Sequence, residues 1–577
     1  MKPFVHPKAH VAGLLQSAIS QITPGAPEVV VERPSQAGHG DFACSMALQL
    51  AKTLKRTPRD VAQAIVAGLP PSDLIDRIEI AGPGFINFSL KPLAWQRLAA
   101  QVLDAGSGYG SNGLGRGERI QVEFVSANPT GPLHVGHGRG AAYGASLANV
   151  LAHAGYSVQR EYYVNDAGRQ MDILALSTWL RYLAICGEQL PFPANAYQGG
   201  YVRAMAQSLQ VLHGQRYLRA AAEALANVPA AAADPEGHLD ALIANAKSLL
   251  GQDYVFIHDF VLEDQLGDCR NDLSEFGVSF DSWFSEKTLH ESGLIDRAVE
   301  ALKKHGHIYE QDGALWFRSS AFGDEKDRVV RRDNGVYTYF AADIAYHLNK
   351  FERGFTRVID VWGADHHGYI PRVKGSLTAA GQDADRLTIA LVQFAVLYRN
   401  GQKASMSTRA GEYVTLRDLR HEVGNDAARF FYVLRKSDQH LDFDLDLAKS
   451  QSNDNPVYYI QYAHARIASV FAGWGGVEAD LADADASLLV HPQEIALLRR
   501  LAEFPETVDS AVRDLAPHII AYYLKDLAAD LHGLYVSCQF LVEDEPLRHA
   551  RLLLIAATRS VLSLGLNLLG VSAPEKM

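Results

Sequence analysis

The segment from residue 120 to residue 153 constrains the fold of this chain more than any other segment. Residues 120–125 (IQVEFV) have the apolar pattern of a strand, and a helix rich in small residues follows from about Arg139. The tetrapeptide His-Val-Gly-His lies between them at 134–137. A strand, a turn and a helix in this order bring a ligand to the end of a parallel sheet. Gly136 leaves room for the backbone to approach that ligand, and the two imidazoles lie near a helix N-terminus, where an anion is favoured. The segment therefore predicts a nucleotide site on a doubly wound sheet.

Length and charge describe a large protein with several domains. The chain has 577 residues, of which 48% are hydrophobic, enough for three or more domains with separate cores. Its formal net charge of −12 argues against indiscriminate nucleic-acid binding, because uniform affinity for a polyanion needs a positive field. An RNA partner would therefore contact local basic patches.

The cysteines and the apolar segments favour a reduced, cytoplasmic protein without a membrane anchor. The 4 cysteines lie far apart with no CxxC pair, so we expect neither structural zinc nor a disulfide framework. The N-terminal residues lack the apolar core of a signal peptide, and no uncharged apolar run of roughly 18 residues follows. The apolar tail from Leu552 to Val571 contains several polar side chains, which favours a packed helix over a membrane span.

The sequence divides into three parts. A glycine-rich stretch at 104–119 has the composition of a flexible linker. Strand and helix patterns alternate after it, except for an alanine-rich interval at 184–255 that predicts a helical insertion. From about Asn455 the spacing of apolar residues indicates helices throughout. We expect a small α+β domain, a doubly wound parallel-sheet (Rossmann-like) catalytic domain with an insertion, and an α-helical bundle. Their boundaries are 1–110, 111–454 and 455–577.

The histidine tetrapeptide belongs to a longer set of matching stretches. Residues 126–144 (SANPTGPLHVGHGRGAAYG) and 405–411 (SMSTRAG) resemble the two ATP-handling signatures of class I aminoacyl-tRNA synthetases. Several further stretches resemble bacterial arginyl-tRNA synthetases in particular, from about residue 25 to the C-terminus and most weakly between about 180 and 260. They are 38–52 and 79–90 in the N-terminal domain, 397–419 around the second signature, and 424–467 at the junction with the anticodon-binding part.

The resemblance implies an activity and a set of partners. It implies ATP-dependent activation of L-arginine to arginyl-adenylate and transfer to tRNA(Arg), with release of AMP and pyrophosphate. Mg²⁺ would accompany ATP, held mainly by phosphate and water. The N-terminal domain would contact tRNA, and the bundle would recognise the anticodon. We expect a monomer. Tyr458, Tyr459, Tyr462 and Arg466 are candidates for stacking on bases or contacting phosphates, but they are equally consistent with core and boundary residues of a bundle.

The chemistry requires stabilised phosphate charge rather than a protein nucleophile. His134 and His137 can donate hydrogen bonds to the triphosphate beside Gly136. Arginine needs acceptors for its guanidinium, and Tyr339 and Asp343 are four residues apart, on one face of a predicted helix. The resemblance adds Glu123, Ser126 and Asn128 for the head of arginine, and Asp365 and His366 for ATP. A metal site at Asp365, His366 and His367 is the disfavoured alternative, because sequential histidines seldom converge on one ion.

The second signature departs from its usual pattern. Its two customary lysines are replaced by Ser405 and Thr408, and Gly131 stands where some relatives carry a compensating lysine. We expect Lys403 and Arg409 to supply the cations, with Met406 and Ser407 beside ATP. Two alternatives remain open. Another class I synthetase is disfavoured because an acidic pocket rejects uncharged amino acids, and a catalytically silent tRNA-binding paralogue would explain the missing lysines.

Overall fold

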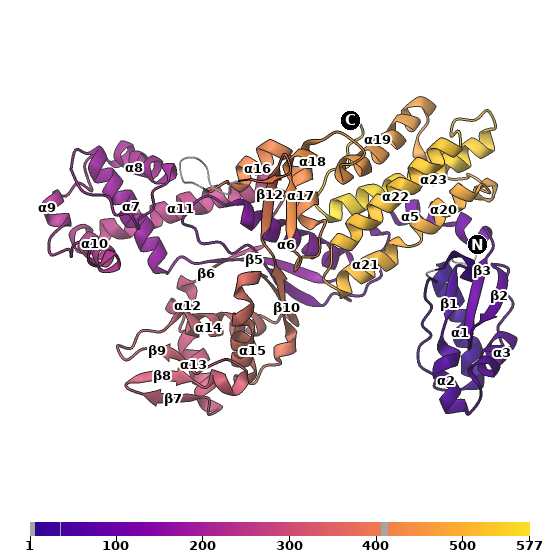
Figure 1. The fold of residues 1–577 in the computed structure, drawn as a ribbon, viewed down its shortest axis with the longest axis horizontal. Coiled ribbons are helices and arrows are strands. Elements are labelled where there is room, and N and C mark those ends of the chain that lie inside the picture. The colour runs from indigo at the N-terminus through magenta and orange to yellow at the C-terminus, as the bar shows by residue number, and fades with distance from the viewer. Residues whose placement is uncertain (1–5, 35, 405–412) are drawn as a thin grey trace.

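The N-terminal part is a small α+β unit, as predicted. The computed structural model describes residues 6–34, 36–404 and 413–577. Three strands form an antiparallel sheet in the order β1, β3, β2, and helices α2 and α3 pack against it (Figure 1). The elements are α1 (Pro7–Ile22), β1 (Phe42–Cys44), α2 (Met46–Leu54), α3 (Pro58–Ala67), β2 (Ile75–Ala81) and β3 (Phe85–Leu90).

The glycine-rich stretch after this unit is anchored, contrary to the prediction of a flexible linker. Helices α4 (Leu93–Gln96) and α5 (Leu98–Ala105) precede it, and α5 packs on the last helix of the chain. Tyr109 then lies buried, with its ring 6.0 Å from that of Phe504 and its hydroxyl donating to the Leu501 carbonyl at 2.8 Å. Backbone hydrogen bonds from Gly115 to Ala154 and from Gly117 to Gly155 hold the stretch as well, and composition alone does not show these contacts.

The centre of the molecule is a parallel five-stranded sheet, which confirms the doubly wound prediction. The strand order is β11, β10, β4, β5, β6, and every neighbouring pair is parallel. The chain runs outward from β4 through β5 to β6 and then returns to the other side of β4, so the order reverses between β4 and β10. Ligands bind at such a switch point. The strands are β4 (Arg119–Glu123), β5 (Ser157–Val164), β6 (Ser282–Ser285), β10 (Arg357–Gly363) and β11 (Leu387–Val392).

Helices cover both faces of this sheet and create two cores. Helix α6 (Val135–His153) covers one face, within a core that continues into the C-terminal helices. Helices α13 (Leu294–Lys304), α14 (Tyr339–Glu352) and α15 (Ile370–Ala379) form the other core. Successive residues of β10 alternate between the two, since Val358 belongs to the second core and Ile359 to the first. This alternation is the pattern of a strand that is buried on both faces.

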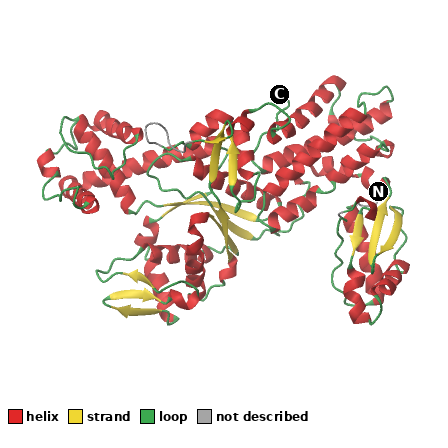
Figure 2. Ribbon diagram, viewed as in Figure 1, coloured by secondary structure: helices red, strands yellow, loops and turns green. Residues whose placement is uncertain are grey.

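The helical insertion after β5 is confirmed, and a small sheet accompanies it later in the chain. Figure 2 shows helices and loops without strands at the far end of the molecule from the N-terminal unit. The insertion helices are α7 (Arg169–Ile185), α8 (Gly200–His213), α9 (Ala221–Ala224), α10 (Pro235–Leu250) and α11 (Gln252–Glu275). After α12 (Lys287–Glu291), an antiparallel sheet precedes α14 that the sequence patterns did not predict; its strands are β7 (Ile308–Gln311), β8 (Ala314–Phe317) and β9 (Arg328–Arg331).

A further three-stranded sheet and three short helices connect the central domain to the C-terminal bundle. They are β12 (Ala395–Arg399), β13 (Gln402–Lys403), α16 (Leu416–Val423), α17 (Asn425–Val433), β14 (Leu441–Asp444) and α18 (Leu445–Lys449). The bundle itself confirms the helical prediction. Its helices are α19 (Pro456–Trp474), α20 (Pro492–Leu501), α21 (Phe504–Arg513), α22 (His518–Ser537) and α23 (Glu545–Leu568).

Helix α23 is the core helix of this bundle. It is long and apolar enough to cross a membrane by length and composition, but 67% of its most apolar window is buried inside the protein. It packs against α5, α19, α20 and α22. Its apolar side chains therefore already have partners within the fold.

Helix α6 is tied to the bundle along one face. The Tyr143 hydroxyl donates to the Leu515 carbonyl at 2.8 Å, the Ser146 hydroxyl to the Leu569 carbonyl at 3.2 Å, and the Asn149 amide to the Leu568 carbonyl at 3.2 Å. The three donors are spaced three residues apart, which puts them on one side of the helix. The helix that carries the histidine tetrapeptide at its start is thus held by the C-terminal domain.

Candidate active site

The histidines of the tetrapeptide cap the helix that follows them. His134 precedes the first residue of α6, and its Nδ1 accepts a hydrogen bond from the Gly136 N–H at 3.0 Å. The Nδ1 of His137 accepts from the His134 N–H at 3.3 Å, which completes a capping box. A Cβ atom at Gly136 would lie 2.8 Å from the His134 ring. Glycine is therefore required for the histidine to fold back onto its own helix.

Both histidines are neutral hydrogen-bond donors. Desolvation by burial lowers the pKa of His134, and burial together with the neighbouring His134 ring lowers the pKa of His137 to about 3. The two rings stack with centroids 3.6 Å apart. Because each Nδ1 accepts a hydrogen bond, the proton of each neutral ring is on Nε2. Each ring therefore has one N–H donor left for a ligand and brings no positive charge.

The flank of the second signature lies beside the first, although about 270 residues separate the two. The Val135 N–H donates to the Val414 carbonyl at 3.2 Å, and the Leu416 N–H donates to the Leu133 carbonyl at 2.7 Å. Lys403 lies exposed at the end of β13, two residues before the signature begins in the sequence. The predicted residues Met406, Ser407 and Arg409 lie outside the described residues.

A strained turn follows β4 at the switch point. Val125 and Ser126 have φ angles of 67° and 41°, in the left-handed region that β-branched residues rarely adopt. The Ser126 hydroxyl donates to Glu123 Oε1 at 2.8 Å and accepts from the Tyr163 N–H at 3.1 Å. Asn128 follows, and its amide donates to Gln170 Oε1 at 2.8 Å. Backbone strain of this kind, which costs roughly 1–3 kcal/mol per residue, clusters at functional sites.

Glu123 has a cationic partner inside the protein. The Lys350 ammonium lies 2.5 Å from Glu123 Oε2 and 2.7 Å from Asp360 Oδ1. The sequence patterns missed this lysine. The sequence could have indicated it, because Lys350 stands seven residues after Asp343 and therefore lies on the same face of helix α14.

The first turns of α14 carry Tyr339 and Asp343. Tyr339 is exposed, whereas Asp343 is half-buried and accepts a hydrogen bond from the Tyr369 hydroxyl. Desolvation raises the pKa of Asp343, and the Tyr369 hydrogen bond only partly opposes it. Within the described residues, no Lys or Arg forms an ion pair with Asp343. The sequence patterns did not predict Tyr369, which ends the polar stretch after β10.

A second acid, also missed from the sequence, faces Asp343. Glu286 lies just after β6 and is 3% exposed. Burial raises its pKa to about 7, nearby Asp343 and Asp166 add to the rise, and a hydrogen bond with Tyr163 opposes it. The basic side chain paired with it is His290, whose Nε2 lies 3.8 Å from Glu286 Oε1. No local pattern around Glu286 distinguishes it from a surface residue, so only the fold reveals it.

These side chains line two adjoining cavities, which we call the joined cavity. Their volumes are about 450 and about 340 Å³, and Tyr163, Asn165 and Asp343 line both. Glu123, Ser126, Asn128, Gly363 and His366 line the larger part, and Glu286 and Tyr339 line the smaller one. All five residues predicted for arginine therefore meet at one cavity.

The predicted residue Asp365 lies beside the joined cavity rather than along its wall. Asp365 is exposed in the turn after β10, with its Oδ2 3.7 Å from His366 Nε2. Arg169 lines the smaller part, but two carboxylates of helix α10 already pair with its guanidinium, Glu236 at 2.8 Å and Asp240 at 2.7 Å. Over the described parts of the chain, no group of three or more His, Cys, Asp or Glu is arranged to hold a metal ion.

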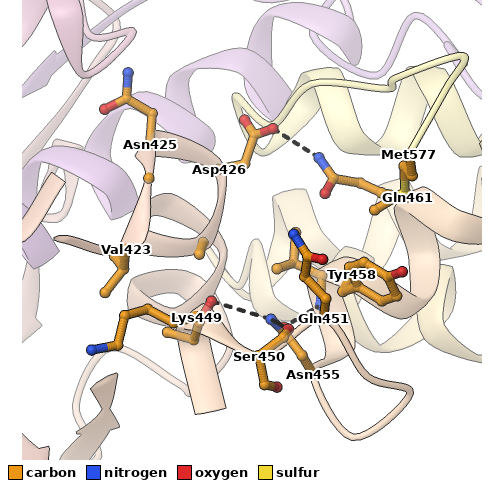
Figure 3. A pocket seen from close by; sticks show the side chains of 14 residues that line it. Val423, Asn425, Asp426, Lys449, Ser450, Gln451, Asn455, Tyr458, Gln461 and Met577 are labelled. Carbon is orange, nitrogen blue, oxygen red and sulfur yellow. Dashed lines mark hydrogen bonds between the residues drawn. The ribbon is translucent and has the colours of Figure 1, made fainter. Parts of the chain in front are cut away.

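A separate cavity of about 450 Å³ lies where the central domain meets the bundle (Figure 3). Asp426 of α17 accepts from the Gln461 amide of α19 at 2.7 Å and from the Ser572 N–H at 3.0 Å. Tyr458 lines the cavity, and its ring is parallel to that of Tyr462 at 6.2 Å. The junction thus joins two domains and the C-terminal residues around an aromatic pair.

The parallel sheet, its switch-point cavity and the histidine-capped helix define a class I aminoacyl-tRNA synthetase. Family models agree with this conclusion. Residues 100–182 and 274–442 match the model described as "tRNA synthetases class I (R), catalytic domain". Residues 9–90 match "Arginyl tRNA synthetase N terminal domain", and residues 460–577 match "DALR anticodon binding domain".

Full-length relatives give the particular family. The arginine–tRNA ligase of Azoarcus sp. (strain BH72) is 62% identical, and the match covers 99% of each chain. That of Nitrosospira multiformis is 61% identical over 100% of both chains. The solved arginyl-tRNA synthetase of Thermus thermophilus has the same fold, with a TM-score of 0.74 at 24% identity over 99% of this chain and 100% of that chain. The chain belongs to the arginyl-tRNA synthetase family.

Proposed function

We propose that this chain is an arginine–tRNA ligase whose joined cavity binds L-arginine beside ATP. The observation that carries the proposal is a cavity with two partly or fully buried acids, Asp343 and Glu286, that have no Lys or Arg partner among the described residues. A guanidinium is a planar cation with five N–H donors, which suits facing carboxylates. An uncharged amino acid would leave both acids unpaired.

Arginine is oriented along the joined cavity by the difference between its two ends. Its guanidinium contacts Asp343, Glu286 and Tyr339 in the smaller part. Its ammonium and carboxylate groups lie in the larger part, near Glu123, Ser126 and Asn128. This direction is supported because Gly363, which ends β10, and His366, which follows it, line only the larger part, so the reactive carboxylate faces the nucleotide side.

ATP lies at the N-terminus of α6. The Nε2 donors of His134 and His137 contact the triphosphate, the Gly136 backbone approaches it, and Asp365 and His366 flank the adenosine. Burial lowers the pKa of both rings, so we assign the positive charge for pyrophosphate departure to Lys403 and Arg409, with Met406 and Ser407 beside the nucleotide. Mg²⁺ enters with ATP, coordinated mainly by phosphate oxygens and water.

The outer domains bind tRNA(Arg). The exposed Tyr462 ring, its neighbour Tyr458 and the Arg466 guanidinium, which lies 3.7 Å from the Tyr535 ring, offer stacking surfaces for unpaired bases. We assign residues 1–110 to an additional tRNA-contacting domain, 111–454 to catalysis and 455–577 to anticodon recognition. The protein acts in the cytoplasm as a monomer.

A charging assay with a panel of amino acids tests the proposal. With ATP and tRNA(Arg), arginine alone should be charged, and lysine, citrulline and glutamine should stay at background. Citrulline is the most informative member, because it keeps the shape of arginine and lacks the charge. Charging of citrulline at a comparable rate would remove the acidic pocket from the account. Tight tRNA binding without arginine-dependent pyrophosphate exchange would instead indicate a silent tRNA-binding paralogue.

A further inference from the structure

Three neighbouring strands of the parallel sheet carry a carboxylate at the same level. Glu161 of β5, Glu123 of β4 and Asp360 of β10 are partners in the strand register. All three are buried, with exposed fractions of 0%, 8% and 0%. Neighbouring strands are about 4.8 Å apart, so three negative charges in a row would repel one another strongly in the protein interior. Such a row requires cations nearby.

Helix α14 and its C-cap residue Arg353 supply basic side chains at three-residue intervals. His347 Nε2 lies 2.9 Å from Asp360 Oδ2, and the Lys350 ammonium bridges Asp360 and Glu123. Arg353 pairs with both oxygens of Glu161, at 2.6 and 2.8 Å. We call the three acids and three bases the charge ladder. The bases follow one another along one side of α14, and the acids stand at one level across three strands, so each base lies beside an acid.

Lys350 is the centre of the charge ladder. Its side chain is fully buried, and its ammonium also lies 4.3 Å from the centre of the Tyr346 ring. Desolvation favours the neutral amine, but Asp360, Glu123 and Glu161 outweigh it and raise the pKa of Lys350, so the lysine stays charged. Of the three bases, it alone pairs with Glu123 among the described residues.

The same helix carries Asp343, two turns before Lys350. Seven residues of α-helix span about 10 Å along the axis. Lys350 therefore connects the strand that ends in Glu123 to the helix that presents Asp343 to the joined cavity. A shift of α14 along the sheet would change the separation of these two acids, and the pairing of Lys350 with Glu123 and Asp360 opposes that shift.

We propose that Lys350 is a positioning residue that fixes the span between Asp343 and Glu123, and thereby the length of the cationic amino acid that the site accepts. The proposal rests on the proposed function, in which these two acids contact opposite ends of arginine. Lys350 itself contacts no substrate. It acts by holding helix α14 against strand β4.

The test compares arginine with homoarginine, which is one methylene longer. Pyrophosphate exchange in the presence of tRNA gives kcat and KM for both amino acids, in wild type, Lys350→Met and Lys350→Arg. For Lys350→Met we expect kcat/KM for arginine to fall about ten- to a hundred-fold, mainly through KM. The ratio of kcat/KM for arginine to kcat/KM for homoarginine should fall by at least about threefold. A site distinguishes one methylene only when the distance between its two acids is fixed. Lys350→Arg should restore most of this preference.

The matched control is Arg353→Met, measured together with the thermal midpoint of each variant. It removes a cation from the same face of α14 and leaves a buried acid unpaired, but Lys350 keeps both of its partners. We expect a loss of stability with an unchanged preference. An unchanged preference in Lys350→Met, or an equal change in both variants, would overturn the proposal.

Two further variants keep the test decisive. If Lys350→Met does not fold, the double variant Lys350→Met, Asp360→Asn is measured instead, because it removes one charge of each sign. It should show the same narrowed preference for arginine over homoarginine, and a wild-type preference would overturn the proposal.

Glu123→Gln tests the proposed function separately. An unchanged arginine KM in Glu123→Gln would remove Glu123 from the substrate site, and the proposed function and the span proposal would then both fail. An unchanged preference in the Lys350 variants would overturn the span proposal alone.

Discussion

The two walls of the joined cavity carry the same kind of side chain in opposite electrostatic states. On the sheet wall, Glu123 pairs with Lys350 at 2.5 Å. On the opposite wall, Asp343 accepts a hydrogen bond from the Tyr369 hydroxyl, and Glu286 lies 3.8 Å from the His290 imidazole. Neither acid forms an ion pair with a Lys or Arg of the described residues. An acid that is paired with a cation of the protein contributes shape and position to the site. An acid without such a partner favours the binding of a cationic ligand. We therefore propose that the selectivity for a guanidinium comes from the wall whose acids have no Lys or Arg partner among the described residues.

The pKa shift of an acid behind the sheet wall is opposite in sign to the shifts of the acids on the other wall. Asp360 does not line the cavity, and although desolvation opposes its ionisation, Lys350 and His347 lower its pKa. On the opposite wall, burial raises the pKa of Asp343 and brings that of Glu286 to about 7. Raised values of this kind mark groups whose charge is satisfied by a ligand rather than by the fold.

The largest expected effect follows from Asp343→Asn, which keeps the shape of the side chain and removes its charge. Loss of a charge-assisted contact to the guanidinium should cost roughly 1.5–3 kcal/mol, or about ten- to a hundred-fold in kcat/KM for arginine. The KM for ATP should barely change. Steady-state pyrophosphate exchange checks this, with the exposed Asp385→Asn as control. An unchanged arginine kcat/KM would make Asp343 a helix residue without a substrate role.

Glu286→Gln should weaken arginine binding while it stabilises the folded chain at high pH. Arginine should bind the ionised form, so wild-type affinity should fall as the pH decreases through about 7, and this dependence should be weaker in the variant. At pH 8 we expect kcat/KM to fall by about three- to tenfold. Isothermal titration of arginine between pH 6 and 8 measures the first effect. Identical pH profiles for the two proteins would contradict the assignment of Glu286.

The same substitution should stabilise the folded chain at high pH. The pKa of Glu286 is raised on folding, so its contribution to the free energy of unfolding is favourable at low pH and is lost as the pH increases through about 7. Glu286→Gln should therefore raise the free energy of unfolding by about 1–3 kcal/mol at pH 8 and by much less at pH 5. Denaturant melts at both values check this. A variant that is less stable at pH 8 would mean that the fold itself compensates Glu286.

Tyr369→Phe should have the smallest effect. It removes a neutral hydrogen-bond donor from Asp343, worth about 0.5–1.5 kcal/mol, and should change kcat/KM for arginine by about two- to tenfold. Tyr339→Phe removes a hydroxyl at the exposed side of the same cavity, and its kcat/KM for arginine is compared with that of Tyr369→Phe. A loss with Tyr369→Phe as large as that with Asp343→Asn would show that the hydroxyl, and not the charge, determines arginine recognition.

The sequence predicted the parts of this site that depend on local pattern. The strand, turn and capped helix around Gly136 are a contiguous signal, and Tyr339 and Asp343 share a face because helical periodicity requires it. Glu286 and Tyr369 could not be predicted in this way, since they reach the cavity only through the strand order of the sheet. The anchoring of the glycine-rich segment by Tyr109 was likewise invisible, because its partner Phe504 is about 400 residues away in the sequence.

The orientation of arginine in the joined cavity tests the comparison of the two walls most directly. A crystal structure of the chain with L-arginine, in the presence of tRNA(Arg), should place the guanidinium within hydrogen-bond distance of both Asp343 and Glu286. The ammonium group should then lie near Glu123 and Asn128, with Lys350 still between Glu123 and Asp360. A guanidinium bound to Glu123, with Lys350 displaced, would contradict the account, because the compensated wall would then be the one that recognises the substrate.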